Sequence, residues 1–255
     1  MIELSSQNKT ILLVSDVHHD VTRLTKILKH EAPDVAACLG DWFDSQWYTA
    51  YCHALDTCHF LTGYLLTDRF ISALGNHDLP YIFGKKEFAV SGYDDARYDL
   101  VQKTLGDSRH KLRDSFVWGF WIDDWFCTHA GLHPGHLPAH LHYTFKRSSF
   151  NKWFDQEVAV ADVHAKFGST HWFYQAGEAR DGKASRGGIL WQDYRNEFMP
   201  ISEIKQIFGH TSDKDVVCVE DKDPNNCKNI KIDCFLNEYL IIRNGKIEVK
   251  RYMDI

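Results

Sequence analysis

The feature that most constrains the fold is a series of apolar, strand-length segments that each end in polar side chains. Residues 11–14, 35–39 and 70–74 are the first three of these segments. Apolar runs of this length are typical of parallel strands that are buried on both faces of a sheet. Residues 21–28 have apolar side chains at helical spacing, and a further helix is predicted over residues 46–61. Repeated strand, turn and helix units predict an α/β sheet whose functional site lies beyond the carboxyl ends of the strands.

The second half of the chain has the pattern of β-hairpins. Residues 116–122 and 125–128 flank Asp123-Asp124, and residues 239–243 and 246–252 flank Asn244-Gly245, which is the strongest short hairpin signal. We therefore expect an antiparallel sheet to accompany the first sheet. Residues 143–186 are rich in aromatic residues and helix formers, and they predict a helical insertion near the site.

Length and charge exclude several classes of protein. A chain of 255 residues is near the upper limit for one hydrophobic core, so we expect residues 1–255 to form one domain. The formal charge of −6 gives no general attraction to polyanions, so we expect no duplex nucleic acid partner. The longest apolar runs are far shorter than the roughly 20 residues that a bilayer requires, and the N-terminus lacks the pattern of a signal peptide. We expect a cytoplasmic protein without a membrane span.

The cysteine pattern favours reduced thiols. The chain has seven cysteines, an odd number, and no C-x-x-C pair, which argues against a disulfide framework. Cys218, Cys227 and Cys234 lie close together in the sequence and could hold a zinc ion or form one bridge. Free cysteines more often act as small buried hydrophobic residues.

Polar residues that can bind metals follow five of the predicted strands. The first cluster, Asp16-Val17-His18, places a carboxylate and an imidazole two residues apart, so both side chains can point toward one cation. The clusters that follow the other strands contain Asp41, Asp44, Asn76, His77, His129 and His210. Five such clusters, each at the end of an apolar run, are difficult to explain as separate loops, and they predict one metal site.

In their order along the chain, these clusters resemble the motifs of the calcineurin-like metallophosphoesterases, which are D-x-H, G-D-x-x-D, G-N-H-D/E, H and G-H. Residues 129–134 and 188–191 are similar to segments of the phosphoprotein phosphatase and bis-nucleosyl tetraphosphatase branch of that superfamily. Three segments differ from the usual patterns. Ser212 replaces a second histidine of other branches, and Ser45-Gln46 replaces the arginine and glycine that follow Asp44 in this branch. Ser15-Asp16-Val17-His18-His19 replaces the usual G-D-x-H-G. The resemblance implies two packed mixed β-sheets flanked by helices, with the helical insertion added.

The resemblance also implies a pair of divalent metal ions. Asp16, His18 and Asp41 would bind the first ion. The second would be bound by Asp41, Asn76, His129 and His210, with Asp41 bridging both. Two ions roughly 3.5–4 Å apart can share a water and lower its pKa toward about 7, which provides a hydroxide to attack a phosphate ester. Carboxylate, imidazole and amide ligands suit Mn²⁺, with Fe or Zn²⁺ as alternatives.

The resemblance also implies roles for further side chains in catalysis and substrate binding. His77 would protonate the leaving oxygen as a general acid, and Asp44 would orient His77 and stabilise its protonated form. Arg180 and Arg186 are candidates for a bidentate phosphate clamp, although each could be a solvated loop residue and Lys183 could serve instead.

Two groups of residues have alternative interpretations. His133, His136, His140 and His142 could line the substrate pocket or be loop histidines. The aromatic residues Trp153, Phe154, Trp172, Phe173 and Tyr174 could stack on a nucleobase, but core packing of the insertion is the more common use of such residues.

These features predict a binuclear metal-dependent phosphoesterase that acts on a phosphorylated protein or nucleotide. The first hypothesis is a phosphomonoesterase of the protein phosphatase type. The second is a nucleotide hydrolase or phosphodiesterase of the dinucleoside polyphosphate type. A non-catalytic interaction module is a third, but such a module could lose ligands, and this chain retains the core set.

Overall fold

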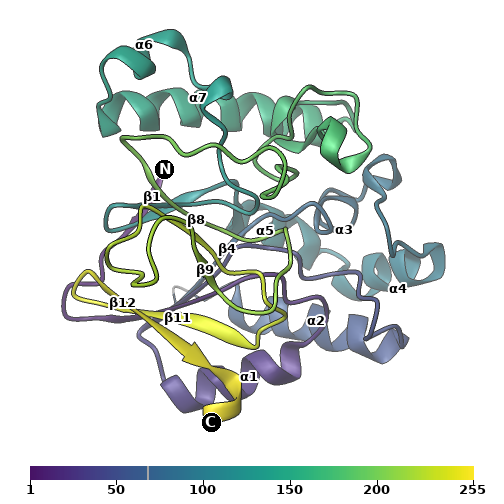
Figure 1. The fold of residues 1–255 in the computed structure, drawn as a ribbon. Helices are drawn as coiled ribbons and strands as arrows, with labels where there is room; N and C mark the ends of the chain where they lie inside the picture. Colours follow the sequence, from purple (N-terminus) through teal and green to yellow (C-terminus); the bar gives the residue numbers. More distant parts are fainter. Residues whose placement is uncertain (68) are drawn as a thin grey trace.

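Two six-stranded sheets form the centre of the computed structural model, which describes residues 1–67 and 69–255 (Figure 1). The first sheet has the strand order β12 (Lys246–Arg251), β11 (Glu238–Arg243), β2 (Thr10–Val14), β3 (Val35–Cys38), β4 (Phe70–Ala73) and β5 (Phe116–Val117). The second has the order β1 (Ile2–Leu4), β6 (Phe120–Ile122), β7 (Trp125–Cys127), β8 (Lys205–Phe208), β10 (Asn229–Lys231) and β9 (Val217–Cys218).

Both sheets are mixed, so the expected separate antiparallel sheet is wrong. Strands β2, β3, β4 and β5 are parallel, and the β11–β12 hairpin joins them by antiparallel pairing of β11 with β2. The second sheet contains the β6–β7 hairpin, but β7, β8 and β10 pair in parallel. Both predicted hairpins therefore form, but long connections bring each one beside parallel strands. The expectation of two mixed sheets flanked by helices is confirmed.

Helices cover the outer faces of both sheets. Helices α1 (Val21–Glu31) and α2 (Tyr51–Tyr64) cover the first sheet, and α3 (Leu79–Phe83), α4 (Asp95–Leu105) and α5 (Ser108–Ser115) continue this layer beside α2. Helices α6 (Ala139–Tyr143) and α7 (Arg147–Lys166) lie on the side of the molecule opposite α1 (Figure 1). Short 3₁₀ turns occur at η1 (Lys86–Phe88), η2 (Pro134–His136), η3 (Trp172–Tyr174), η4 (Glu178–Arg180) and η5 (Tyr252–Asp254).

The hydrophobic core has one layer between the sheets and another beneath the helices. In β2, Ile11 and Leu13 face the second sheet, whereas Leu12 and Val14 face the helices. Successive side chains of a strand point to opposite faces, so a strand covered on both sides must be apolar throughout. This explains the continuous apolar runs in the sequence. On the far side, Phe150 and Phe154 of α7 pack against Phe126 of β7.

Three predicted elements have different bounds in the structure. The helix expected over residues 46–61 begins at Tyr51, because residues 45–48 form a turn in which the Ser45 hydroxyl accepts hydrogen bonds from the amides of Trp47 and Tyr48. Residues 116–122 form two strands in different sheets. The chain crosses between them at Gly119, where a Cβ atom would lie 3.0 Å from Thr128 Cγ2. The insertion is α-helical over α7, and residues 167–186 are mainly loop with the short 3₁₀ turns η3 and η4.

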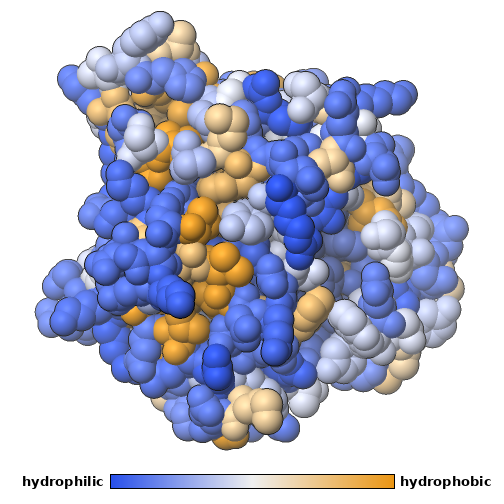
Figure 2. Space-filling view, viewed as in Figure 1, coloured by the Kyte–Doolittle hydropathy of each residue, from blue (hydrophilic) through white to orange (hydrophobic). Residues whose placement is uncertain are grey.

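The surface shown in Figure 2 is mostly hydrophilic, with apolar residues gathered in smaller patches. Within the described part of the chain, no helix combines the length and apolar character needed to cross a bilayer.

Candidate metal centre

The ends of five strands bring the predicted ligands together. Asp16, Asp41 and Asn76 follow the neighbouring parallel strands β2, β3 and β4, while His129 and His210 follow β7 and β8 of the second sheet. Two groups of ligand atoms lie within 4.8 Å of one another: one contains Asp16, His18 and Asp41, and the other contains Asp41, His129 and His210. Asp41 belongs to both groups, as a bridging carboxylate would.

In the second group, nitrogen and oxygen atoms that can bind a metal converge on His129 Nε2. His129 Nδ1 lies 2.9 Å from the carbonyl oxygen of Leu39, so it is the nitrogen that carries the proton. His129 Nε2 then faces Asn76 Oδ1 at 2.9 Å, His210 Nδ1 at 3.1 Å and Asp41 Oδ2 at 3.4 Å. Burial lowers the pKa of His129 to about 4, and it lowers the pKa of His210 well below its usual value. Neutral rings with converging lone pairs fit a cation.

The first group has the same arrangement around His18. Its Nδ1 lies 2.6 Å from the carbonyl oxygen of Asp44, and its Nε2 lies 3.7 Å from Asp41 Oδ2. Asp16 accepts hydrogen bonds from the His210 amide, at 3.1 Å, and from the Ser15 hydroxyl. Burial, followed by the charge of Asp16, raises the pKa of Asp41 well above its usual range. Because a cation would offset this crowding of buried carboxylates, the donor set fits a divalent metal ion.

Backbone strain is concentrated at the same positions. Asp16, His18, Asp41, Asp44 and His210 all have φ between 43° and 67°, the left-handed region that side chains with a Cβ atom rarely adopt. Such residues persist only where the surrounding structure holds them, and they cluster at functional sites.

His77 and Asp44 lie beside the two ligand groups. His77 Nδ1 is 3.4 Å from Asp44 Oδ2, and the His77 amide donates to Asp41 Oδ1 at 2.9 Å. Asp44 also accepts a hydrogen bond of 2.5 Å from the Tyr81 hydroxyl, and Arg97 Nη1 is 3.5 Å from Asp44 Oδ1. The structure therefore places His77 against a carboxylate that is itself held by two further side chains. Tyr81 and Arg97 were not predicted, because no motif contains them.

Asp78 connects two of the loops that carry predicted ligands. It lies within the G-N-H-D motif, but no role was predicted for it. Its carboxylate accepts hydrogen bonds from the amides of Asp41 at 2.9 Å, Trp42 at 2.7 Å and Gly75 at 2.8 Å. Burial raises the pKa of Asp78 to about 7. These bonds tie the loop after β3 to the loop after β4, so Asp78 fixes the relative positions of Asp41 and Asn76.

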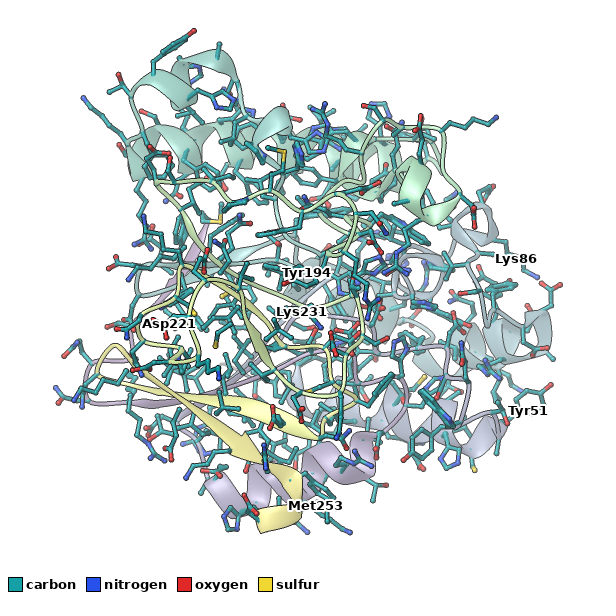
Figure 3. The ribbon with its side chains drawn as sticks, viewed as in Figure 1. Tyr51, Lys86, Tyr194, Asp221, Lys231 and Met253 are labelled. Atoms are coloured by element: carbon teal, nitrogen blue, oxygen red, sulfur yellow. The ribbon has the colours of Figure 1, made fainter. Side chains whose placement is uncertain are left out.

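Asp233, which follows β10, lines the same cleft as His18, Asp41 and His77. No sequence motif contains it. It is 3% exposed, and its Oδ1 has no hydrogen-bond partner among the described residues. Burial and then the charge of Asp16 raise the pKa of Asp233 well above its usual range. Nearby, Lys231 Nζ donates to the carbonyl oxygen of Thr211 at 3.0 Å and lies 5.6 Å from the ring centroid of Tyr194 (Figure 3).

The candidate phosphate-binding residues occupy three different places. Arg180 lines a cleft of about 220 Å³ together with His18, Asp41, His77 and His210, and its Nε is 2.8 Å from Asp193 Oδ2. The guanidinium of Arg186 lies against Gly135 and is not among the described residues that line this cleft. Lys183 lines an adjoining cavity of about 490 Å³, which meets the cleft at Asn76 and Trp191.

His133, His136, His140 and His142 are not among the described residues that line the cleft. His136 stacks on Trp172 with the ring centroids 4.3 Å apart, and His133 Nδ1 accepts a hydrogen bond from the Gly135 amide. His140 and His142 lie in α6.

Of the aromatic residues in the insertion, Phe154 and Phe173 are fully buried, as core packing predicts, whereas Tyr174 lines the adjoining cavity. All seven cysteines are free, and no cysteine belongs to a potential metal group in the described residues.

Comparisons with known proteins identify the family and the fold. The family model described as calcineurin-like phosphoesterase matches residues 9–222. No match was found among curated protein sequences.

Three solved structures have a similar fold. A cold-active protein-tyrosine phosphatase from a psychrophilic Shewanella species is 18% identical with a TM-score of 0.62, and the match covers 99% of this chain and 80% of that one. A protein serine/threonine phosphatase from Saccharomyces cerevisiae is 12% identical with a TM-score of 0.51, covering 98% and 83% of the two chains. A protein proposed to be a diadenosine tetraphosphatase is 15% identical with a TM-score of 0.50, covering 98% and 97%.

These likenesses show the shared fold, and the family follows from the sequence match. That match includes every residue of the two ligand groups. The chain therefore belongs to the calcineurin-like phosphoesterases, and it is a metal-dependent hydrolase of phosphate esters.

Proposed function

We propose that the protein is a phosphomonoesterase of the protein phosphatase type. The main observation in support is that the His77–Asp44 pair and Arg180 line one cleft together with members of both ligand groups, His18, Asp41 and His210. Asp16, His18 and Asp41 would hold one metal ion, and Asp41, Asn76, His129 and His210 would hold the second. Bound divalent ions supply Lewis acidity and an acidified water, and the donor set suits Mn²⁺, Fe or Zn²⁺.

The remaining chemistry belongs to side chains of the chain. His77 has its Nδ1 next to Asp44, which leaves Nε2 to give a proton to the leaving oxygen. Tyr81 and Arg97 hold Asp44 in place, so the ring of His77 is oriented before a substrate binds. Arg180 brings a guanidinium to the same cleft. Its Nη2 donates to the Thr211 hydroxyl at 3.0 Å and its Nε faces Asp193, so it would reach a phosphate through Nη1.

Two of the similar structures are protein phosphatases, which supports a phosphoprotein as the substrate. The free cysteines suit a reducing compartment, so we place the protein in the cytoplasm.

A nucleotide hydrolase is the second candidate, and one observation favours it. The cavity of about 490 Å³ beside the cleft is lined by Lys183, Tyr174 and Trp191. A lysine and aromatic rings could receive the second phosphate group and a base of a dinucleoside polyphosphate.

The two candidates differ in the substrate they accept. The Mn²⁺-loaded protein should hydrolyse p-nitrophenyl phosphate and phosphopeptides, but not bis-p-nitrophenyl phosphate or diadenosine tetraphosphate. Faster turnover of the bis ester or of diadenosine tetraphosphate would reject the phosphomonoesterase in favour of the second candidate.

A further inference from the structure

Two exposed aromatic side chains lie together at the mouth of the cleft. Trp47 is 64% exposed and Phe235 is 36% exposed, and their ring centroids are 5.0 Å apart in an edge-to-face arrangement. The two residues come from loops that are far apart in the sequence, after β3 and after β10. Large apolar side chains that are grouped and left in solvent mark a binding surface more often than single ones do.

The pair connects the metal ligands to a second cavity. Trp47 and Phe235 line the cleft that contains His77, and both also line a separate cavity of about 250 Å³. Asp16 and His18 line the same cavity. An organic group that is attached to a phosphate at the ligand groups and extends into this cavity would therefore meet these two rings.

The loops on both sides hold the rings in position. Phe235 and Leu236 have φ of 57° and 56°, which is costly for bulky side chains in succession. Arg23 Nη1 stabilises this turn by donating to the Phe235 carbonyl oxygen at 2.7 Å, and Leu236 is buried. On the other loop, the Ser45 hydroxyl accepts a hydrogen bond from the Trp47 amide at 3.2 Å.

Asp20, at the start of α1, connects the two loops. Its Oδ2 accepts a hydrogen bond of 2.9 Å from the Tyr48 hydroxyl and lies 3.0 Å from Arg23 Nε. Since Tyr48 follows Trp47 and Arg23 holds Phe235, one carboxylate fixes the spacing of the two rings. The cavity wall is therefore organised before a ligand binds, which reduces the entropy cost of binding.

We propose that Trp47 and Phe235 form an aromatic clamp that receives the ring of an aryl phosphomonoester, the chemistry of a phosphotyrosyl side chain. This inference rests on the proposed phosphomonoesterase function. In an aryl ester the ring is bonded directly to the ester oxygen, so a phosphate at the ligand groups would keep the ring within the cleft that His18, Trp47 and Phe235 line together. A nucleobase is separated from its phosphate by a ribose, and a phosphoserine side chain has no ring face to stack.

Steady-state kinetics of the wild type and of the variants Trp47→Ala and Phe235→Gly test the clamp. Phe235→Gly is informative because glycine accepts positive φ, so the change removes the ring and relieves backbone strain together. We expect kcat/KM for phenyl phosphate, divided by kcat/KM for β-glycerophosphate, to fall about three- to tenfold in each variant, the range expected for one aromatic contact. Tyr143→Ala removes another exposed ring, which is not among the described residues that line the cleft or the cavity beside it, and should leave the ratio unchanged.

A binding measurement separates the clamp from the proposed function. In calorimetric titrations of the Mn²⁺-loaded protein, benzylphosphonate should bind more tightly than ethylphosphonate, and both variants should lose this preference. Equal affinity of the two phosphonates for the wild type, or a preference that survives in both variants, overturns the clamp. If the protein cleaves diadenosine tetraphosphate but neither monoester, the proposed function fails, and the benzylphosphonate titration still decides whether the clamp exists.

Discussion

His77 is the side chain whose proposed role depends most on its neighbours. It is not part of either ligand group, yet its amide contacts the shared carboxylate of Asp41 and its ring contacts Asp44. A histidine in this position can lose its side chain without removing a metal ligand. Its contribution to turnover can therefore be measured apart from metal binding.

His77→Ala should lower kcat for phenyl phosphate by about 10²–10⁴-fold, the usual range of general acid catalysis. The loss should be smaller for p-nitrophenyl phosphate, because nitrophenolate leaves without a proton. Steady-state kinetics would measure both losses, and the manganese content of the purified variant should match the wild type. His140→Ala, at an exposed histidine in α6, serves as the control. Equal losses on the two esters would argue against proton donation by His77.

His133 leads to a prediction about stability and pH. Burial, with the nearby charges of Arg186 and His136, lowers the pKa of His133 to about 4 from a usual value of 6.5. Between these two values the unfolded chain binds more protons than the folded one, so this residue costs stability as the pH falls from 6.5 toward 4 and has no effect above that window.

In the wild type, His133 Nδ1 accepts a hydrogen bond of 2.8 Å from the Gly135 amide. His133→Asn removes the titrating ring but keeps a side-chain acceptor for this amide. Between pH 7.5 and pH 5, the urea midpoint of the variant should fall less than that of the wild type. Parallel decreases in the two proteins would show that His133 does not contribute to the acid sensitivity.

At the scale of elements, the close approach of two loops decides whether the site can form. Gly40 has φ of 101°, and a Cβ atom on it would lie 2.3 Å from the Gly75 amide nitrogen. Asp78 joins the same two loops by accepting hydrogen bonds from both. The glycines therefore permit the contact, and the carboxylate stabilises it.

Gly40→Ala should lower the free energy of unfolding by about 3 kcal/mol or more, since it combines a disfavoured φ with a backbone clash. Gly63→Ala is the matched control. Gly63 is exposed in α2 with nothing within 4 Å of an added Cβ atom, so the change should raise stability by about 0.5–1 kcal/mol. Urea unfolding would measure both. A Gly40→Ala variant as stable as the wild type would contradict the close packing of these loops.

On the scale of the whole molecule, the ligand groups join the two sheets. Asp16, Asp41 and Asn76 follow strands of the first sheet, and His129 and His210 follow strands of the second. A cation held by all of them would bind the folded state and not the unfolded chain. Metal binding should therefore stabilise the entire fold.

Adding Mn²⁺ at 100 times its Kd should stabilise the protein by about 2.7 kcal/mol. For a chain of this size, that corresponds to a rise in Tm of about 5–10 °C over protein in EDTA. Differential scanning calorimetry would measure the shift. Asp41→Asn removes the charge of the shared carboxylate and should lose more than half of the rise. Equal Tm values for the wild type in Mn²⁺ and in EDTA would show that the two groups do not bind manganese.

Local sequence pattern was sufficient to find β2, β3 and β4 and the polar residues that follow them. Strands that are covered on both faces have continuous apolar runs, and motifs made of neighbouring residues are visible without knowledge of the fold. The β11–β12 hairpin was visible for the same reason, because Asn244 and Gly245 supply the two positive φ values, 50° and 73°, that its turn requires.

Tertiary packing alone decided the rest. The strand predicted over residues 116–122 divides between two sheets at Gly119, which lies close to Thr128, a contact that no local pattern encodes. Arg97, Tyr81 and Asp233 reach the site from α4, α3 and the end of β10, and their neighbours in the sequence give no sign of this. The pairing of Trp47 with Phe235 likewise depends on contacts between residues nearly two hundred positions apart. Only the folded chain brings such residues together, because their spacing in the sequence carries no information about their distance in space.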